Sequence, residues 1–151
     1  MKPLLAVVIT VFFTNSLLAQ SAVDSADEQV FFSMNEVDLT QFKWKKRPVV
    51  VFADSELDPA FLEQMELLQA RPDELIARDI VVITDTSPDP LSNLRRKLRP
   101  RNFMLVLMSK DGTVNVRKPF PWDVREISRS VDKMPTRKRE IRERKQRATD
   151  R

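Results

Sequence analysis

Three short apolar runs are the feature of this 151-residue chain that most restricts its fold. They cover residues 49–53, 80–83 and 103–108, and no polar residue interrupts any of them. A short run that is apolar throughout is typical of a strand buried on both faces of a sheet. Segments with helical spacing separate the runs, so the sequence predicts strands of one sheet joined by helical crossovers.

The two crossovers carry recognisable helix boundaries. Asp58-Pro59 predicts a helix start, because Asp satisfies free backbone N–H groups and Pro lacks one. Pro72 is expected to break or restart this helix. The second crossover is predicted to hold a short helix over residues 91–98, which Pro100 ends. The residues expected on the buried faces of these helices are Phe61, Leu62, Met65, Leu68, Leu91, Leu94 and Leu98.

A hairpin and a last helix follow the third run. Gly112 stands in a turn that requires positive φ, and residues 114–117 alternate as expected of a half-exposed edge strand. Asp123 and Glu126 predict a capping box for a helix that ends at Pro135. The predicted order is therefore β-α-β-α-β-β-α, an α/β fold with the thioredoxin-like arrangement of a mixed sheet and helices on both faces.

The N-terminus has the pattern of an export signal. Lys2 precedes an almost unbroken apolar stretch at residues 4–13, and Ala19 is a suitable small residue for cleavage. Residues 1–19 are therefore predicted to be a signal peptide, which implies a periplasmic or secreted protein. An uncleaved N-terminal anchor is the alternative, although the apolar stretch is short for a membrane span.

The remaining chain divides into a lead-in segment at residues 20–43, the thioredoxin-like domain at 44–135 and a charged tail at 136–151. The tail is expected to form a solvated helix with no face to bury, supported by the pairs Glu140–Arg144 and Glu143–Arg147. The sequence predicts no membrane span after signal cleavage.

Missing residue types exclude many activities. The chain contains no Cys and no His, so thiol chemistry, imidazole proton transfer and Cys- or His-ligated metal sites are impossible. Its one Gly cannot build a phosphate-binding loop or a dinucleotide-binding turn. We therefore predict no catalytic set, no cofactor and no metal, and an enzyme is the less favoured reading.

Four segments together resemble a known family. The chain is similar to the bacterial domain of unknown function 4174 family, whose members are mostly exported, have a thioredoxin-like fold and supply no catalytic residue. Compared with the wider thioredoxin superfamily, the redox Cys pair would fall at residues 54–57 and the cis-proline near Phe103, and Pro100 is offset from that place. The resemblance therefore implies a fold without oxidoreductase activity. The segments that carry it are residues 44–52, 78–82, 107–112 and 132–140.

One candidate site follows the first central strand. Asp54, Ser55, Glu56 and Asp58 come at the carboxyl end of that strand, where ligands bind in open α/β sheets. Neighbouring carboxylates could bind a cation or act as acid and base. The simpler interpretation is a polar loop in which Asp58 caps the helix.

A second candidate is a basic cluster without an acid, consisting of Arg95, Arg96, Lys97, Arg99 and Arg101. It could hold an anionic partner such as a phosphate-bearing head group. Its simpler interpretation is a solvated face with cations near a helix C-terminus. The charged tail at residues 136–151 could likewise bind a membrane surface or a polyanion by charge alone. Its simpler interpretation is a solubilising extension.

The leading hypothesis is a non-enzymatic interaction module of the cell envelope that binds another protein or an anionic surface, with no specific nucleic acid. One alternative is a carboxylate-dependent, metal-assisted enzyme that uses the Asp54–Asp58 loop. The other is a polyanion-binding protein. The oligomeric state and the partner are left open by the sequence.

Overall fold

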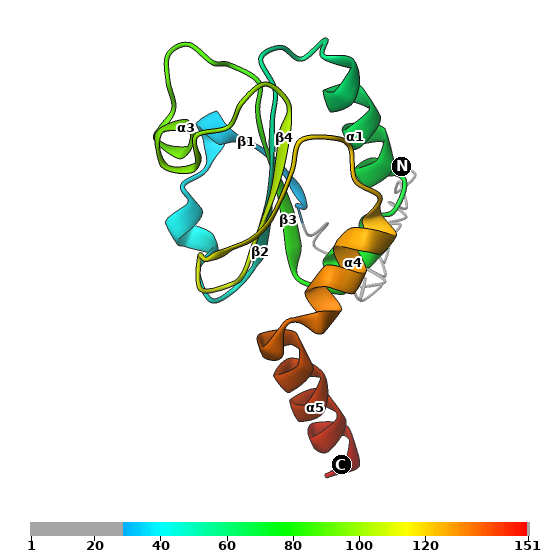
Figure 1. Ribbon diagram of the computed structural model, residues 1–151. Coiled ribbons are helices and arrows are strands. Elements are labelled where there is room, and N and C mark those ends of the chain that lie inside the picture. Colours follow the sequence, from blue (N-terminus) through cyan, green and yellow to red (C-terminus); the bar gives the residue numbers. More distant parts are fainter. Residues whose placement is uncertain (1–28, 151) are drawn as a thin grey trace, which may run out of the picture.

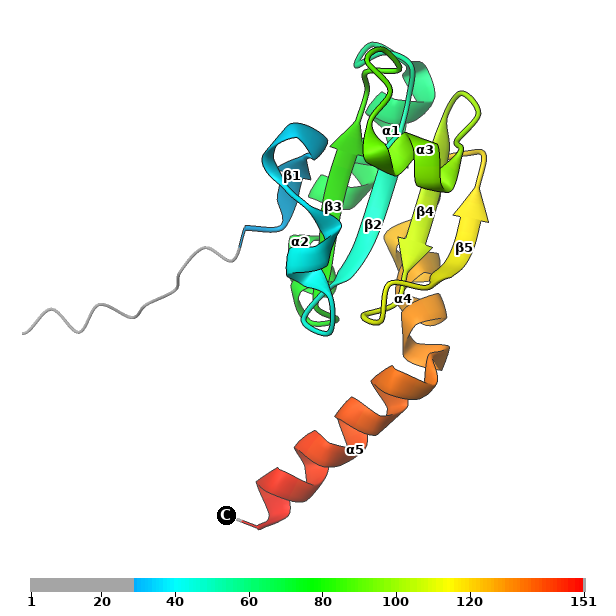
Figure 2. The same cartoon turned by 90° about the vertical axis from the view of Figure 1, so that its left-hand side faces the viewer.

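One mixed sheet organises residues 29–150, the part of the chain that the computed structural model describes. Its strand order is β1-β3-β2-β4-β5 (Figures 1 and 2). Strands β1, β3 and β2 are parallel, β4 is antiparallel to β2, and β5 is antiparallel to β4. The strands are β1 (Phe31–Ser33), β2 (Arg47–Phe52), β3 (Ile80–Asp85), β4 (Met104–Met108) and β5 (Val114–Lys118).

Helices cover both faces of this sheet. Helices α1 (Pro59–Gln69), α2 (Pro72–Ile76) and α4 (Val124–Lys133) lie on one face (Figure 1). Helix α3 (Asn93–Leu98) lies on the other, together with two short 3-10 helices, η1 (Met34–Glu36) and η2 (Leu39–Phe42). Helix α5 (Pro135–Thr149) projects from the end of the sheet at which β2 begins (Figure 2). We call this the basal end, and the opposite end the apical end.

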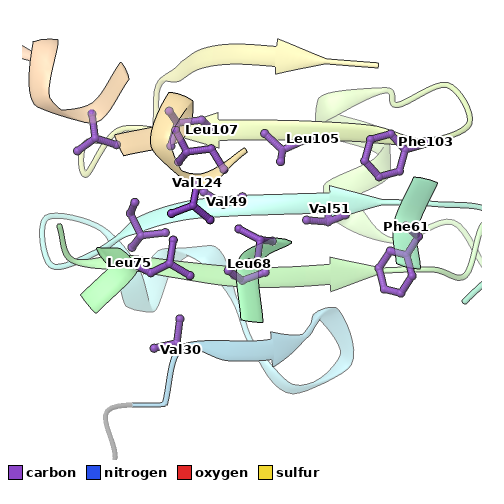
Figure 3. Packing of buried hydrophobic residues seen from close by; sticks show 14 of the residues in the cluster. Val30, Val49, Val51, Phe61, Leu68, Leu75, Phe103, Leu105, Leu107 and Val124 are labelled. Carbon is purple, nitrogen blue, oxygen red and sulfur yellow. The ribbon is translucent and has the colours of Figure 1, made fainter. Parts of the chain in front are cut away.

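Strand β2 lies at the centre of two hydrophobic clusters. Val49 and Val51 face the cluster under α1, α2 and α4, which includes Leu68 (Figure 3). Val50 and Phe52 face the cluster under α3 and the 3-10 helices. Residues 49–52 of β2 are buried, as their unbroken apolar pattern predicted, and the two residues before them, Arg47 and Pro48, are buried as well.

The predicted element order and fold class are confirmed. The structure has the β-α-β-α-β-β-α core in β2 to α4, with Pro72 beginning the separate helix α2. Asp58 caps α1 by accepting hydrogen bonds from the N–H groups of Ala60 and Phe61. Gly112 has φ +89° in the β4–β5 turn.

The sheet extends further than the sequence indicated. Strand β1, which falls in the expected lead-in segment, pairs with β3 from Phe31 opposite Val82 to Ser33 opposite Thr84. The ring of Phe32 lies 5.3 Å from that of Phe42, so η2 is also attached to the sheet. These residues belong to the folded core, because the sheet and the apolar cluster beneath it include them.

Two residues expected on buried helix faces are exposed. Leu62 is 52% exposed and Leu91 is 51% exposed. On α1 the buried polar residue Gln64 takes an inward position instead, donating to the backbone oxygen of Trp122 and accepting from its N–H. Leu91 lies before the first residue of α3, so its spacing to Leu94 was not helical.

Two polar pairings that the sequence predicted are absent from the structure. Asp123 caps α4 through the N–H of Arg125, but the Glu126 carboxylate pairs with Arg129 at 2.6 Å, so the predicted capping box is not formed. In α5, Glu143 pairs with Arg147 at 3.8 Å as predicted, whereas Glu140 does not pair with Arg144.

The predicted signal peptide at residues 1–19 lies outside the described residues. Among residues 29–150, no helix combines the length and apolar character that a membrane span requires.

Candidate functional site

The apical end carries both candidate clusters. The loop that follows β2 exposes Asp54, Ser55 and Glu56, and its last residue, Leu57, is 80% exposed. The Ser55 hydroxyl accepts a hydrogen bond from the N–H of Leu57 at 3.1 Å, which stabilises the turn. Asp58 is committed to the start of α1.

Arg95 is not part of a free basic patch. Its side chain is 5% exposed, and its Nε donates to the Asp85 carboxylate at 2.9 Å. Its Nη2 donates to the backbone oxygens of Ala53 and Asp85, and its Nη1 lies 3.5 Å from the Asp54 carboxylate. The guanidinium also lies over the ring of Phe52. The expectation of a cluster without an acid is therefore wrong for Arg95.

Asp85 is the partner that sequence reasoning missed. It is the last residue of β3, and its carboxylate also accepts a hydrogen bond from the Ser92 hydroxyl at 2.7 Å. The signal for it was an Asp two residues after an apolar run, which does not by itself reveal a partner ten residues later. Asp85 and Arg95 together fasten the carboxyl ends of β2 and β3 to α3.

The remaining basic residues do not form one site. Arg96, Lys97, Arg99 and Arg101 are exposed. Arg96 and Arg99 line an open hollow with Leu91 and Arg95, whereas Lys97 lines a different cavity beside η2. Arg99 ends α3 with a left-handed backbone, φ +49°.

The acidic loop also has its own surroundings. Glu56 lines a cavity of about 190 Å³ between the β2–α1 and β3–α3 loops, whose lining also includes Asp85 and Asp89. Asp54 and Arg95 are thus the residues of the two candidate clusters that the structure brings into contact. Within residues 29–150, no group of three or more carboxylates is placed to hold a metal ion.

The cis peptide bond among the described residues is Asp89–Pro90, in the β3–α3 loop. Pro100, which the sequence left unassigned, precedes β4 with a trans bond.

The basal end holds an ion-pair network that the sequence did not reveal. Arg47 is completely buried, and its Nη2 donates to the Glu140 carboxylate at 2.8 Å. Its Nη1 donates to the backbone oxygen of Arg78 at 2.8 Å. The Lys110 ammonium bridges Asp79 at 2.8 Å and Glu140 at 3.0 Å.

Glu140 is the centre of this network. Burial by itself raises the pKa of its carboxyl, but hydrogen bonds and charge from Arg47 and Lys110 outweigh burial and lower the pKa to about 2. Glu140 stays ionised at neutral pH and attaches the first turns of α5 to the sheet. The expected tail without a buried face is therefore corrected, because an ionic contact replaces the missing apolar one.

Arg137 strengthens the same attachment. It is 7% exposed, donates to the backbone oxygen of Ala77 at 2.8 Å and lies 3.3 Å from Glu140. Beside it, Arg78 makes a two-pronged ion pair with Asp132 at 3.1 and 2.9 Å.

The basal network draws on each of the four segments that carry the family resemblance. No two of these segments are adjacent in sequence, and the fold brings one charged side chain from each to the basal end. Their common location indicates that they have a shared structural task in fixing α5. The four residues are Arg47, Asp79, Lys110 and Glu140.

Comparison with known proteins gives a family and a fold. The family model described as "Domain of unknown function (DUF4174)" matches residues 38–140. Two solved structures illustrate the fold. The reduced 2-Cys peroxiredoxin of Plasmodium vivax is 17% identical with a TM-score of 0.53, over 64% of this chain and 81% of that chain. Prx1a of Plasmodium yoelii is 18% identical with a TM-score of 0.50, over 64% and 77%. None of the curated proteins compared with the chain matches it.

Proposed function

The chain belongs to the DUF4174 family, and from that premise we propose that it is an exported thioredoxin-like domain that binds a protein partner in the cell envelope without catalysing a reaction. The likeness to peroxiredoxins concerns the fold, and the chain has no Cys with which to perform thiol chemistry.

One observation carries this proposal: the Arg95 guanidinium binds the carboxyl ends of β2 and β3 and the Asp85 carboxylate. Open α/β sheets bind ligands at the carboxyl ends of their strands. Here Arg95 occupies that place and neutralises Asp85, which is also hydrogen-bonded to Ser92. A carboxylate committed in this way is a poor general base and a poor metal ligand.

The exposed apolar residues of the same end offer a binding surface instead. Leu57 stands on a loop whose start is fixed by Arg95 and whose end is fixed by the Asp58 cap. Leu62 follows on α1, beside a shallow hollow lined by Phe61 and Met65. Apolar side chains on a rigid loop bind with little ordering cost, which favours an apolar segment of a partner protein.

Export is part of the proposal because of the N-terminal pattern. Lys2, the apolar stretch at residues 4–13 and Ala19 support a cleaved signal peptide, and thus a periplasmic or secreted location. Detection of a mature chain beginning at Gln20 in the extracytoplasmic fraction is the expected result. A protein retained in the cytoplasm would contradict it.

The test is site-specific crosslinking in the producing cell. A photoreactive residue at Leu57 should capture one defined envelope protein, and Leu62→Asp should reduce that capture strongly, because it places a charge in the apolar contact. A photoreactive residue at Val114, which is exposed on β5, is the matched control. Equal capture from both positions, or no specific product from Leu57, would reject this surface.

The carboxylate-dependent, metal-assisted enzyme is less well supported by the geometry. Asp58 is used as a helix cap, and Asp54 lies within reach of Arg95, so two of the acids in the Asp54–Asp58 loop already have partners. Calorimetric binding of Mg²⁺ or Ca²⁺ that Asp54→Ala abolishes would restore this alternative.

A further inference from the structure

We propose that the basal end of the domain binds an anionic lipid surface through residues 43–46 and helix α5. This inference goes beyond the proposed function, because the partner-binding surface proposed above lies at the apical end. It rests on three observations: an exposed tryptophan between lysines, a lysine-lined cavity beside it, and the charge of the helix that projects from the same end (Figure 2).

Trp44 is presented to solvent by a fixed backbone. Its side chain is 68% exposed, although tryptophan is usually largely buried. The Trp44 N–H donates to the backbone oxygen of Lys110 at 2.6 Å, and the Lys45 N–H donates to that of Phe42 at 3.0 Å. The residue has φ +65°, so these bonds hold it in a turn that directs the ring away from the core.

Lysines surround this ring in sequence and in space. Lys43 and Lys45 flank Trp44 and are exposed, and the Lys43 ammonium lies 6.0 Å from the centre of the ring. An indole between ammonium groups suits the boundary of a bilayer. The ring can sit at the level of the head groups while the lysines contact phosphates.

A cavity of about 170 Å³ lies next to this loop, between η2 and the β4–β5 turn. Four lysines and one acid, Asp111, contribute to its lining. Asp111 already accepts hydrogen bonds from the N–H and hydroxyl of Thr113, at 2.9 and 2.7 Å. These hydrogen bonds hold the pKa of the Asp111 carboxyl below its ordinary value, so it stays charged. The Lys110 ammonium is already paired with Asp79 and Glu140. The other three lysines still outnumber Asp111, so the balance of charge at the cavity favours a phosphate group. The lysines are Lys43, Lys46, Lys97 and Lys110.

Helix α5 adds long-range attraction at the same end. It contains seven Lys or Arg residues and two Glu, and one of these, Glu140, is committed to Arg47 and Lys110. Apart from Ile141 and Ala148 it lacks aliphatic side chains, so it can adsorb to a charged surface but cannot insert as an amphipathic helix. Trp44 is therefore the side chain that enters the head-group region of the bilayer in this proposal.

These features favour a lipid surface over a nucleic acid. A nucleic acid needs cations along a groove with stacking rings at intervals, whereas here a single ring stands at a turn between lysines. The proposed export also places the chain beside membranes. A soluble polyanion is retained as an outcome of the test.

The experiment measures binding of the full mature chain to vesicles. The chain has two tryptophans, so Trp122→Phe makes fluorescence report Trp44 alone. With vesicles containing phosphatidylglycerol at low salt, we expect a blue shift of the emission and protection from acrylamide, and neither with pure phosphatidylcholine. All variants begin at Gln20, the first residue of the mature chain proposed above, so the segment before residue 29 is the same in each.

Charge reversals locate the contact. Lys43→Glu with Lys45→Glu should weaken binding to the anionic vesicles by at least about 25-fold, since losing each basic residue near the surface costs about fivefold and each new carboxylate adds repulsion. Arg96→Glu with Arg101→Glu makes the same change in net charge at the apical end and should leave binding within about twofold. Circular dichroism of both pairs verifies that they are folded.

Three outcomes would overturn the proposal. The first is unchanged Trp44 emission in the presence of anionic vesicles. The second is an equal loss of binding in the basal and apical variants. The third is binding of heparin or single-stranded DNA by the basal residues without any binding of vesicles, which would identify a soluble polyanion as the ligand.

Discussion

Two buried arginines stand at opposite ends of the same central strand. Arg47 is the first residue of β2, and Arg95 donates to the backbone oxygen of Ala53 directly after its last residue. Each guanidinium is paired with a carboxylate from a distant part of the chain, Arg47 with Glu140 and Arg95 with Asp85. Burying an arginine is tolerable only with such a partner, so each pair must form as a unit.

Replacing Arg95 by Met should leave the buried Asp85 carboxylate without a charged partner. We expect the free energy of unfolding to fall by about 3–5 kcal/mol, the usual cost of breaking a buried pair. Urea denaturation of Arg95→Met beside Arg96→Met tests this, because Arg96 is exposed on the same helix and should change stability by less than about 0.5 kcal/mol. Similar losses in the two variants would show that Arg95 is not a structural residue.

Glu140 predicts a specific acid sensitivity. Its pKa is about 2 in the folded chain against an ordinary value of 4.5, so its contribution to stability is complete above pH 4.5. That contribution is lost progressively as the pH falls through the folded value. The difference in unfolding free energy between the wild type and Glu140→Gln should be about 3 kcal/mol at neutral pH and should shrink between pH 4.5 and 2. A difference that is constant over this range would contradict the assignment.

The two buried ion pairs could not be predicted from the sequence. Asp85 and Arg95 are separated by 10 residues, and Arg47 and Glu140 by 93. A charged residue has the same local signature whether it is solvated or buried with a distant partner. The sequence shows only that the residues around Arg95 are basic. Whether each of them is solvated or buried with a carboxylate depends on tertiary contacts that the sequence does not reveal.

At the scale of elements, the strands that are apolar throughout were predictable. The central parts of β2, β3 and β4 are buried on both faces, which favours an unbroken apolar run and leaves a clear signal, whereas the buried charged residues Arg47 and Asp85 at the strand ends do not follow it. Strand β1 has three residues and takes its place by pairing with β3, which no local pattern encodes. Leu62 was misplaced because periodicity alone does not show which side of a helix meets the sheet, and Leu91 because α3 begins after it.

The first turns of helix α5 contact the rest of the domain closely, whereas its later turns extend into solvent. Arg137 and Glu140, in its first two turns, are held against the domain, whereas the residues from Arg142 onward are exposed and contact it through one long ion pair, Arg144 to Asp79 at 3.9 Å. Removing residues 142–151 should change the free energy of unfolding by less than about 0.5 kcal/mol, as for other surface changes. Removing residues 136–151 leaves Arg47 buried without Glu140 and should cost about 3 kcal/mol or more. Thermal denaturation of the two truncated chains distinguishes these cases, and equal melting temperatures would refute the division.

At the scale of the whole molecule, stability should be graded from the centre of the sheet outward. Strand β2 is fully buried between β3 and β4, whereas β1 has three residues and β5 is largely exposed. Hydrogen exchange should therefore be slowest in β2 and β4, faster in β1 and β5, and fastest in the last turns of α5. Mass spectrometry of peptic fragments measures this order. Faster exchange in β2 than in β5 would contradict the described topology.

The two ends of the molecule also differ in what they present. The apical end has short loops held by Arg95, with exposed leucines, and the basal end has lysines, Trp44 and a projecting charged helix. A domain that meets a lipid surface with its basal end would turn its apical end away from that surface. The two proposals are thus geometrically compatible, although each has its own test.

The Arg47–Glu140 pair has a consequence for when the basal end can fold during synthesis of the chain. Strand β2 leaves the ribosome early, but the carboxylate that neutralises its first residue follows 93 positions later. Until then the basal end contains a cation that the folded core cannot accommodate at low cost. The basal end of a nascent chain therefore cannot complete its fold before Glu140 has been synthesised. Such a delay would suit the export proposed above, which requires a chain that crosses a membrane unfolded.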